Sequence, residues 1–313
     1  MDNIICIAGP TASGKTALAV HLAKALHGEV LSCDSMQVYR HMDIGTAKPS
    51  MAEREGIVHH MMDVADPNEP MSVGKFTDMA APILEDILSR GKTAILAGGT
   101  GLYMDALIRG NDFAPVPATG CREQLQARAA REGCAVLLEE LRRVDPESAG
   151  RLHVSDEKRI IRALEVYLET GMTITAHNLR TRQVPDRYAP CWIGLDYTDR
   201  AALYRRIDLR VELMLQAGLL EEIRGLLDAG VSAGATALQA IGYKEFLPVL
   251  LEGRPLSEAV QEVQRSSRRY AKRQLTWFRR NPKIQWLHRT EEQSDEELFH
   301  QARCLIPFFD EGK

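Results

Sequence analysis

The sequence predicts an α/β fold in which a parallel sheet core carries a phosphate-binding loop. The segment Gly9–Thr16 fits the pattern G-x-x-x-x-G-K-[ST] at every specified position. Around it, apolar runs alternate with segments of helical periodicity, an order typical of a doubly wound parallel sheet. This alternation is lost after about residue 112, which indicates a helical insertion.

The phosphate-binding loop stands in the context that the motif requires. Residues 4–8 form an apolar run that predicts a buried strand, and apolar residues at helical spacing follow Thr16. Backbone N–H groups of such a loop and the N-terminus of the next helix supply donors to phosphate oxygens. Lys15 adds a cation, and the hydroxyl of Thr16 is a ligand for Mg²⁺. Strand, loop and helix together predict a P-loop NTPase-like core.

The rest of the N-terminal region continues the alternation. Residues 30–33 and 93–97 are apolar runs that predict strands, and residues 76–89 have the spacing of a helix. Pro82 should kink this helix or delay its start. The Gly and Pro content of residues 43–49 predicts a loop.

After residue 112, a segment containing Pro115, Pro117 and Gly120 has the composition of a linker. Periodicity then predicts helices over 124–131, 135–144 and 156–169, the last ended by Gly171, before a strand at 191–195. We therefore divide the chain into a first core part (1–112), a helical insertion domain (113–189) and a mostly helical second core part (190–313).

The second core part begins with that strand and continues as helices. Periodicity predicts them over 199–217, 219–229, 238–251 and 257–280. Asn281-Pro282 ends the last helix, and residues 284–287 are apolar enough to add a final strand.

Composition limits the partners and the cellular compartment that we expect for the protein. Its 313 residues are 45% hydrophobic and 26% charged, with a net charge of −4, so a polyanionic partner must meet a local basic surface. No apolar run approaches a membrane span, and Met1 leads almost directly into a strand, so we expect no membrane partner and no signal peptide. The six cysteines form no C-x-x-C pair, which favours reduced thiols in a cytoplasmic protein without zinc. We expect a monomer.

A nucleotide is the default ligand of the loop, but two features of nucleotide hydrolysis are missing. The strand at 93–97 ends in Gly98-Gly99-Thr100, so no acidic residue stands where a hydrolase has its metal-binding aspartate. The guanine-reading motifs of a GTPase are also missing from the sequence. Asp34 follows the second strand, at the edge where such sheets bind ligands. It is placed either to act as a base on an acceptor or to cap a turn.

Several sequence blocks, taken in order, resemble the tRNA dimethylallyltransferases, also called tRNA isopentenyltransferases, over nearly the whole chain. The blocks are residues 9–16, 34–39, 42–49, 98–103, 158–165, 239–244 and 272–279. Together they are far more specific than the loop motif alone. The departures are small: His41 stands where the family usually has Gly, and Val154 follows His153 where Pro is usual. His41 can alter the turn after Tyr39.

The resemblance implies that dimethylallyl diphosphate donates its five-carbon group to N6 of adenosine 37 in tRNA, 3′ of the anticodon, and that diphosphate leaves. Lys15 and Mg²⁺ on Thr16 would stabilise the leaving group, and Asp34 would accept a proton from N6. Thr100 resembles a second catalytic position, with a turn residue as the alternative. Arg210 resembles a diphosphate contact, with a solvated helix face as the alternative. The loop residues assigned to diphosphate are Gly9, Pro10, Thr11, Ala12, Ser13, Gly14, Lys15 and Thr16.

A basic segment indicates how tRNA is held. From Arg265 to Arg289 there are nine Lys or Arg and no Asp or Glu, which in an acidic protein suggests a polyanion contact as well as a solvated face. Trp277 and Phe278 in this segment can stack on a base or pack in the core, and Ser35 with Gln37 can read the edge of a flipped adenine. The residues assigned to tRNA are Asp34, Ser35, Met36, Gln37, Arg122, Lys158, Arg159, Ile160, Ile161, Arg162, Gln239, Ala240, Ile241, Gly242, Tyr243, Lys244, Lys272, Arg273, Gln274, Leu275, Thr276, Trp277, Phe278 and Arg279.

Other functions remain open from the residues themselves. A dimethylallyltransferase acting on free adenylate would share the loop and Asp34, but needs neither the basic helix nor a large insertion. A P-loop kinase and a non-enzymatic RNA-binding protein are weaker alternatives, the last because the loop and Asp34 are intact. His59 and His60 can be read as metal ligands, but adjacent strand positions rarely face one metal, so we favour a structural role.

Overall fold

The computed structural model describes residues 2–110, 119–183 and 185–309 of the 313-residue chain. The chain divides into two compact units, one made of Met1–Gly110 with Arg187–Lys313 and the other of Asn111–Asp186. We call these the core unit and the insertion unit. Among the described residues, no helix is long and apolar enough to cross a membrane. The predicted linker at 112–120 lies mostly outside the described residues.

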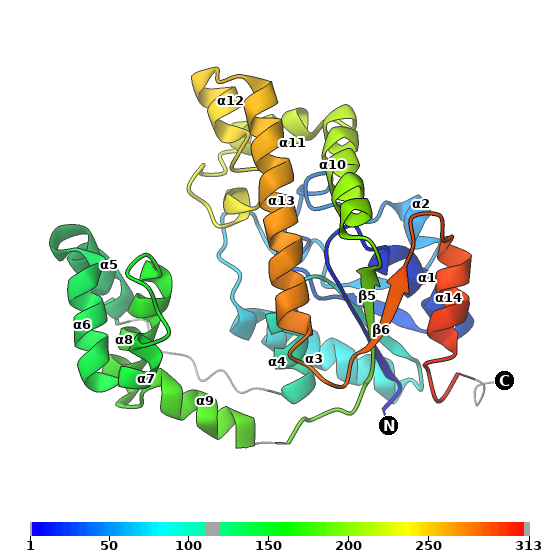
Figure 1. The fold of residues 1–313 in the computed structure, drawn as a ribbon, viewed down its shortest axis with the longest axis horizontal. Helices are drawn as coiled ribbons and strands as arrows, with labels where there is room; N and C mark the ends of the chain where they lie inside the picture. Colours follow the sequence, from blue (N-terminus) through cyan, green and yellow to red (C-terminus); the bar gives the residue numbers. More distant parts are fainter. Residues whose placement is uncertain (1, 111–118, 184, 310–313) are drawn as a thin grey trace. The chain divides into compact units, whose positions relative to one another are not determined.

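The core unit is built on a six-stranded parallel sheet with the order β3-β2-β4-β1-β5-β6 (Figure 1). The strands are β1 (Ile4–Ala8), β2 (Glu29–Ser32), β3 (His59–His60), β4 (Ala94–Ala97), β5 (Cys191–Tyr197) and β6 (Gln285–Arg289). Because all pairs are parallel, the segments that follow β1, β2 and β4 meet at one edge of the sheet. This edge carries the phosphate-binding loop and Asp34.

Alternation along β1 explains how both faces of the sheet are covered. Ile4, Cys6 and Ala8 belong to one hydrophobic core, and Ile5 and Ile7 belong to another, as expected when successive side chains point to opposite faces. All five are fully buried, which is why the strand is apolar throughout and does not alternate in polarity.

Helices lie against both faces. Helices α1 and α14 contribute to the core that contains Ile5 and Ile7, and α3, α4 and α11 contribute to the other (Figure 1). The helices of the core unit are α1 (Lys15–Ala25), α2 (Met51–Arg54), α3 (Val73–Ser89), α4 (Gly101–Arg109), α10 (Arg200–Gln216), α11 (Leu219–Asp228), α12 (Leu247–Glu252), α13 (Leu256–Phe278) and α14 (Asp295–Arg303), with a 3₁₀ turn at Ala237–Gln239.

The insertion unit is helical and has a core of its own, built around Leu125, Leu137, Leu141, Ile160 and Leu164. Gly171 ends its longest helix in the left-handed conformation (φ 67°), as the sequence predicts. Its helices are α5 (Cys121–Glu132), α6 (Cys134–Val144), α7 (Pro146–Ala149), α8 (Glu157–Thr170) and α9 (Ile174–Gln183).

Two predicted helices differ from the structure. Helix α3 begins at Val73, capped by Ser72, so Pro82 lies within the helix and does not delay its start. The segment 238–251 is not one helix, because Ala240 is extended (ψ 148°) and Gly242 is left-handed (φ 92°). Only the short α12 follows. The turn brings Tyr243 to the Glu222 carboxylate, at 2.6 Å.

Candidate active site

The phosphate-binding loop connects β1 to α1 at the carboxyl edge of the sheet. Its bends require glycine: φ is 152° at Gly9 and 93° at Gly14. A Cβ on Gly9 would lie 2.7 Å from the carbonyl oxygen of Leu195, and one on Gly14 would lie 2.4 Å from the guanidinium of Arg289. The loop therefore packs tightly against the ends of β5 and β6.

Lys15 and Thr16 stand at the start of α1, as the motif predicts. The Lys15 ammonium donates to the carbonyl oxygen of Pro10 at 2.6 Å. Burial, and secondly the charge of Arg210, lower the pKa of Lys15 from 10.5 to about 7, while Asp34 acts in the opposite direction. Thr16 is exposed, so its hydroxyl is accessible to a ligand. An anion bound beside Lys15 would raise its pKa again and would favour the protonated form of its side chain.

Asp34 lies shortly after β2 and uses one oxygen locally. Its Oδ1 accepts from the backbone N–H of Met36 at 2.9 Å and of Gln37 at 3.4 Å. Its Oδ2 points toward the loop after β4, 3.9 Å from where a Cβ on Gly99 would stand. Asp34 thus caps a turn with one oxygen, and the other faces the segment that carries Thr100.

Thr100 is tied directly to the Asp34 segment. Its hydroxyl accepts from the N–H of Ser35 at 3.0 Å and donates to the Ser35 hydroxyl at 3.2 Å. The side chain of Tyr270 of α13 also interacts with it. Thr100 therefore links the ends of β2 and β4 to that helix, in addition to occupying the turn before α4.

Arg210 lies over the phosphate-binding loop. Its guanidinium donates to the Thr11 hydroxyl at 3.2 Å, and the residue is partly buried. Burial lowers the pKa of Arg210, and the charge of Asp34 opposes that shift. Its side chain is therefore part of the site, not of a solvated helix face.

His59 and His60 have structural partners and form no metal site with other residues that the structure describes. Within the described ranges, no group of three His, Cys, Asp or Glu residues is arranged to hold a metal ion. His59 bonds to the carbonyl oxygen of Ile57 at 2.9 Å, and His60 to the buried carboxylate of Glu29 at 2.8 Å. Both are engaged structurally. A divalent ion at the loop would depend on Thr16 and on oxygens of the ligand.

Burial divides the residues that the sequence assigns to tRNA. Seven of them have side chains enclosed within their own units: Ile160, Ile161, Ala240, Tyr243, Gln274, Leu275 and Phe278. Gly242 is also buried. Exposed side chains from the same set are those of Lys158, Arg159, Gln239, Lys244, Lys272, Arg273, Thr276 and Arg279.

Other assigned residues have partners inside the protein. The amide of Gln37 accepts from Ser32 at 2.8 Å and donates to the carbonyl oxygens of Thr46 and Ala47, both at 3.3 Å, so it shapes the loop instead of presenting a free edge to adenine. Arg122 and Arg162 both bind the Glu165 carboxylate at 2.8 Å within the insertion unit. Met36 and Ile241 are partly buried.

The basic segment 265–289 is less uniform than its sequence suggests. Arg268 bonds to Asp208 of α10 at 2.5 Å, Arg279 bonds to Asp196 at 2.9 Å, and Arg265 pairs with Glu262. Arg289 is buried behind the phosphate-binding loop, with a side chain 4% exposed. Trp277 donates to Asp105 at 2.9 Å, which favours packing over base stacking.

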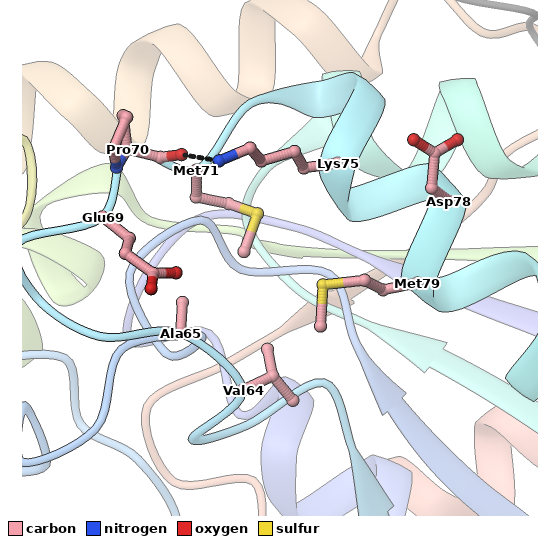
Figure 2. A pocket seen from close by; sticks show the side chains of 8 residues that line it. All are labelled: Val64, Ala65, Glu69, Pro70, Met71, Lys75, Asp78 and Met79. Carbon is pink, nitrogen blue, oxygen red and sulfur yellow. Dashed lines mark hydrogen bonds between the residues drawn. The ribbon is translucent and has the colours of Figure 1, made fainter.

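A separate pocket lies beside α3. It has a volume of about 200 Å³, and Figure 2 shows the side chains of Met71 and Met79 turned into it while Lys75 bonds to the carbonyl oxygen of Pro70. Its remaining lining residues are Val64, Ala65, Glu69 and Asp78. None of the residues assigned to the reaction lines it, so the pocket is not the site described above.

Sequence reasoning missed two contacts between distant parts of the core unit. The side chain of Tyr270 interacts with that of Thr100, and Glu222 accepts from the N–H groups of Asp43 and Ile44 at 2.8 and 2.7 Å. The helical spacing of Tyr270 and Gln274 is the signal that could have identified the first. Nothing local marks Glu222, because its partners lie far away in the chain.

The fold and the site define a P-loop group-transfer enzyme. A loop for a diphosphate or polyphosphate faces a carboxylate and a hydroxyl, and the three residues directly after β4, Gly98-Gly99-Thr100, include no acid. Comparison with known proteins specifies the class further. A family profile described as IPP transferase matches residues 37–281. A tRNA dimethylallyltransferase of Acetivibrio thermocellus is 43% identical over 313 residues, covering 99% of both chains. The chain belongs to the tRNA dimethylallyltransferase family.

Solved structures agree with this assignment. A full-length tRNA isopentenylpyrophosphate transferase from Bacillus halodurans has 39% identity and a TM-score of 0.74, covering 100% of this chain and 98% of its own. A eukaryotic dimethylallyltransferase, described as acting on tRNA, has 31% identity and a TM-score of 0.85, covering 100% of this chain and 80% of its own.

Proposed function

We propose that this protein transfers the dimethylallyl group of dimethylallyl diphosphate to N6 of adenosine 37 in tRNA and releases diphosphate. The observation that carries the proposal is the pairing of an intact phosphate-binding loop with Asp34 and Thr100 on the neighbouring strand ends. A diphosphate uses the same donors as the terminal phosphates of a nucleotide, and a kinase-like metal carboxylate is not needed.

The loop is the leaving-group site in this proposal. When the allylic C–O bond breaks, negative charge grows on the diphosphate, and cations placed around it lower the barrier. Lys15 and Arg210 supply that charge from two elements that the Arg210–Thr11 hydrogen bond holds together. A divalent ion, proposed to be Mg²⁺, would bind the Thr16 hydroxyl and diphosphate oxygens and would neutralise the same charge.

Asp34 is the proposed base. The N6 amine of adenine is a weak nucleophile, because its lone pair is delocalised into the ring, and it must lose a proton as the new C–N bond forms. The Oδ2 oxygen of Asp34 can accept that proton, while Oδ1 keeps the carboxylate oriented through Met36. Thr100 would act beside it as a hydroxyl near the diphosphate.

The tRNA surface is proposed to consist of two basic patches. One is the exposed side of α13 with Arg269, Lys272 and Arg273, and the other is the start of α8 with Lys158 and Arg159. Phosphate neutralisation would supply most of the affinity. The target base, normally stacked in the anticodon loop, would be flipped toward Asp34.

Product analysis tests the proposal against its alternatives. The protein is incubated with Mg²⁺, labelled dimethylallyl diphosphate, and either an anticodon stem-loop RNA or AMP. We expect label in the RNA and release of diphosphate, with no transfer after chelation of the metal. Label in AMP but not in RNA would support an adenylate dimethylallyltransferase. Acceptor-dependent formation of ADP from ATP would support a kinase.

A further inference from the structure

Helix α13 presents one face to the active site through three residues at helical spacing. The side chain of Tyr270 interacts with that of Thr100, Gln274 donates to the carbonyl oxygen of Gly99, and Trp277 donates to Asp105 at 2.9 Å. All three partners lie in the segment that follows β4. The helix therefore holds the Thr100 segment along its length, at positions that one side of a helix brings together.

Gln274 makes the most specific contact of the three. Its Oε1 accepts from the N–H of Thr11 at 2.9 Å, and its Nε2 donates to the carbonyl oxygen of Gly99 at 3.0 Å. One carboxamide thus joins the phosphate-binding loop to the loop after β4. The residue is only 5% exposed, so loss of either bond would leave a buried polar group without its partner.

The glycines opposite the helix are shaped for this contact. A Cβ on Gly99 would lie 2.1 Å from Nε2 of Gln274, and one on Gly101 would lie 2.2 Å from the Trp277 ring. The backbone of the Thr100 segment can approach α13 this closely only because both positions lack a side chain. The approach brings Tyr270 to Thr100, and burial together with the charge of Asp34 raises the pKa of Tyr270 to about 12.

We propose that Gln274 is a positioning residue for group transfer: its carboxamide fixes the distance between the phosphate-binding loop, which holds the donor, and the Thr100 segment beside Asp34. The proposal rests on the proposed function for its kinetic readout. Both polar atoms of Gln274 bond to backbone groups of the two loops, so we assign it the role of joining them. Misplacement of reacting groups by about 1 Å can cost about 10²-fold in rate, so loss of this link should lower kcat more than binding.

Two variants separate positioning from folding. Gln274→Met keeps the length of the side chain but removes both hydrogen bonds, and should lower the single-turnover rate about 10- to 100-fold while changing the Kd for stem-loop RNA less than about twofold. Gln274→Glu keeps the acceptor for Thr11 but turns a carboxylate toward the carbonyl oxygen of Gly99. Protonation restores the donor, so the rate of this variant relative to wild type should rise as pH falls, whereas the ratio for Gln274→Met should stay flat.

The matched control is Gln261→Met, which makes the same change at an exposed position of the same helix. Wild-type rates for Gln274→Met would overturn the proposal, and so would a flat pH ratio for a folded Gln274→Glu. If the wild-type protein transfers no dimethylallyl group, the proposed function fails. The positioning role of Gln274 is then tested by how tightly the variants bind inorganic diphosphate. In that case Gln274→Met should bind inorganic diphosphate about tenfold more weakly than Gln261→Met, and equal binding would overturn the inference.

Discussion

Arg289 of β6 donates to the carbonyl oxygen of Ser13 at 3.4 Å, from behind the phosphate-binding loop. The same guanidinium binds Asp295 at 3.2 Å and the carbonyl oxygen of Gln293 at 2.7 Å. It also fills the space that a side chain on Gly14 would need. A carbonyl held outward in this way leaves the N–H groups of the loop free to point toward a bound anion.

We therefore expect Arg289→Met to weaken diphosphate binding about tenfold, the usual effect of losing one charge-assisted hydrogen bond. Calorimetric titration with dimethylallyl diphosphate measures it. The control is Arg254→Met, which removes an exposed arginine paired with Glu252 at 2.9 Å on the surface. An unchanged Kd for a folded Arg289→Met would show that the loop keeps its shape without this contact.

Lys15 should make donor binding proton-linked. Its pKa in the free protein is lowered to about 7 by burial, and a bound diphosphate would raise it again. Most of one proton should therefore be taken up on binding at about pH 8, and little at about pH 6, where Lys15 is already protonated. Calorimetric titrations in buffers of different ionisation enthalpy measure the proton uptake. The uptake measured with Lys15→Met gives the contribution of the ligand, which is subtracted from the wild-type value. Equal uptake by both proteins would contradict the prediction.

The same shift has a consequence for stability. Because the folded pKa lies below the unfolded one, charged Lys15 destabilises the folded protein fully below about pH 7, and the cost disappears as pH rises toward 10.5. Lys15→Met should thus raise the melting temperature most near pH 6 and least near pH 10. A difference that grows with pH would have the wrong sign for this explanation.

The exposed side of α13 should give RNA binding its salt dependence. Replacement of Arg269, Lys272 or Arg273 by Ala should reduce the slope of log K against log salt by about 1 each. Arg268 is the internal control, because its guanidinium is already bound to Asp208 at 2.5 Å. Fluorescence titrations of stem-loop RNA at several salt concentrations test this. If all three exposed variants have the wild-type slope, this side of α13 is solvated and does not contact RNA phosphates.

How much of the fold and of the site could be predicted from the sequence depends on how far apart in the chain the contacting residues lie. The loop, its strand and its helix are contiguous, so the motif places Lys15 and Thr16 directly, and Asp34 follows from the parallel order of strands. Gln274 is different. It lies in a run of cations that reads as one basic surface, and its partner Thr11 is 263 positions away. Only the fold shows that this face of the helix is turned inward.

The basic run shows the same limit. Nine cations in a segment that contains no acid predict an open basic patch, but Asp208 and Asp196 come from other elements and neutralise Arg268 and Arg279. Burial adds a second distinction, since Ile160 and Tyr243 belong to blocks that the resemblance assigns to tRNA and yet are fully enclosed. Sequence identifies the blocks, and packing decides which members face outward.

His41 stands where the family usually has glycine, and its backbone conformation explains that preference. Its φ is 63°, in the left-handed region, and its side chain is exposed. His41→Gly should therefore stabilise the protein by about 0.5–1 kcal/mol, the strain removed being partly offset by the greater freedom of glycine when unfolded. His41→Ala keeps the Cβ and should not stabilise. Chemical denaturation of both variants checks this, and equal stabilisation by both would exclude backbone strain as the cause.

Asp34→Asn should remove most of the transfer rate while leaving binding nearly intact. The variant keeps an acceptor for the N–H of Met36, so the turn after β2 should persist. It cannot take the proton that N6 must lose, and loss of a general base typically costs about 10²–10⁴ in rate. Affinity for tRNA should change little, because contacts to phosphates dominate it. Single-turnover rates and separate binding titrations keep the two effects apart.

The matched control for this substitution is Asp66→Asn, since Asp66 caps a turn in the same way by accepting from the N–H of Asn68 at 2.9 Å. That change removes a carboxylate from a similar turn away from the phosphate-binding loop, and it should leave the rate at the wild-type value. If Asp34→Asn also transfers at a near-normal rate, its carboxylate only orients the segment that carries Ser35, and proton removal from N6 must belong to another group. A loss of rate confined to Asp34→Asn, with tRNA still bound, is the result that a base at this position requires.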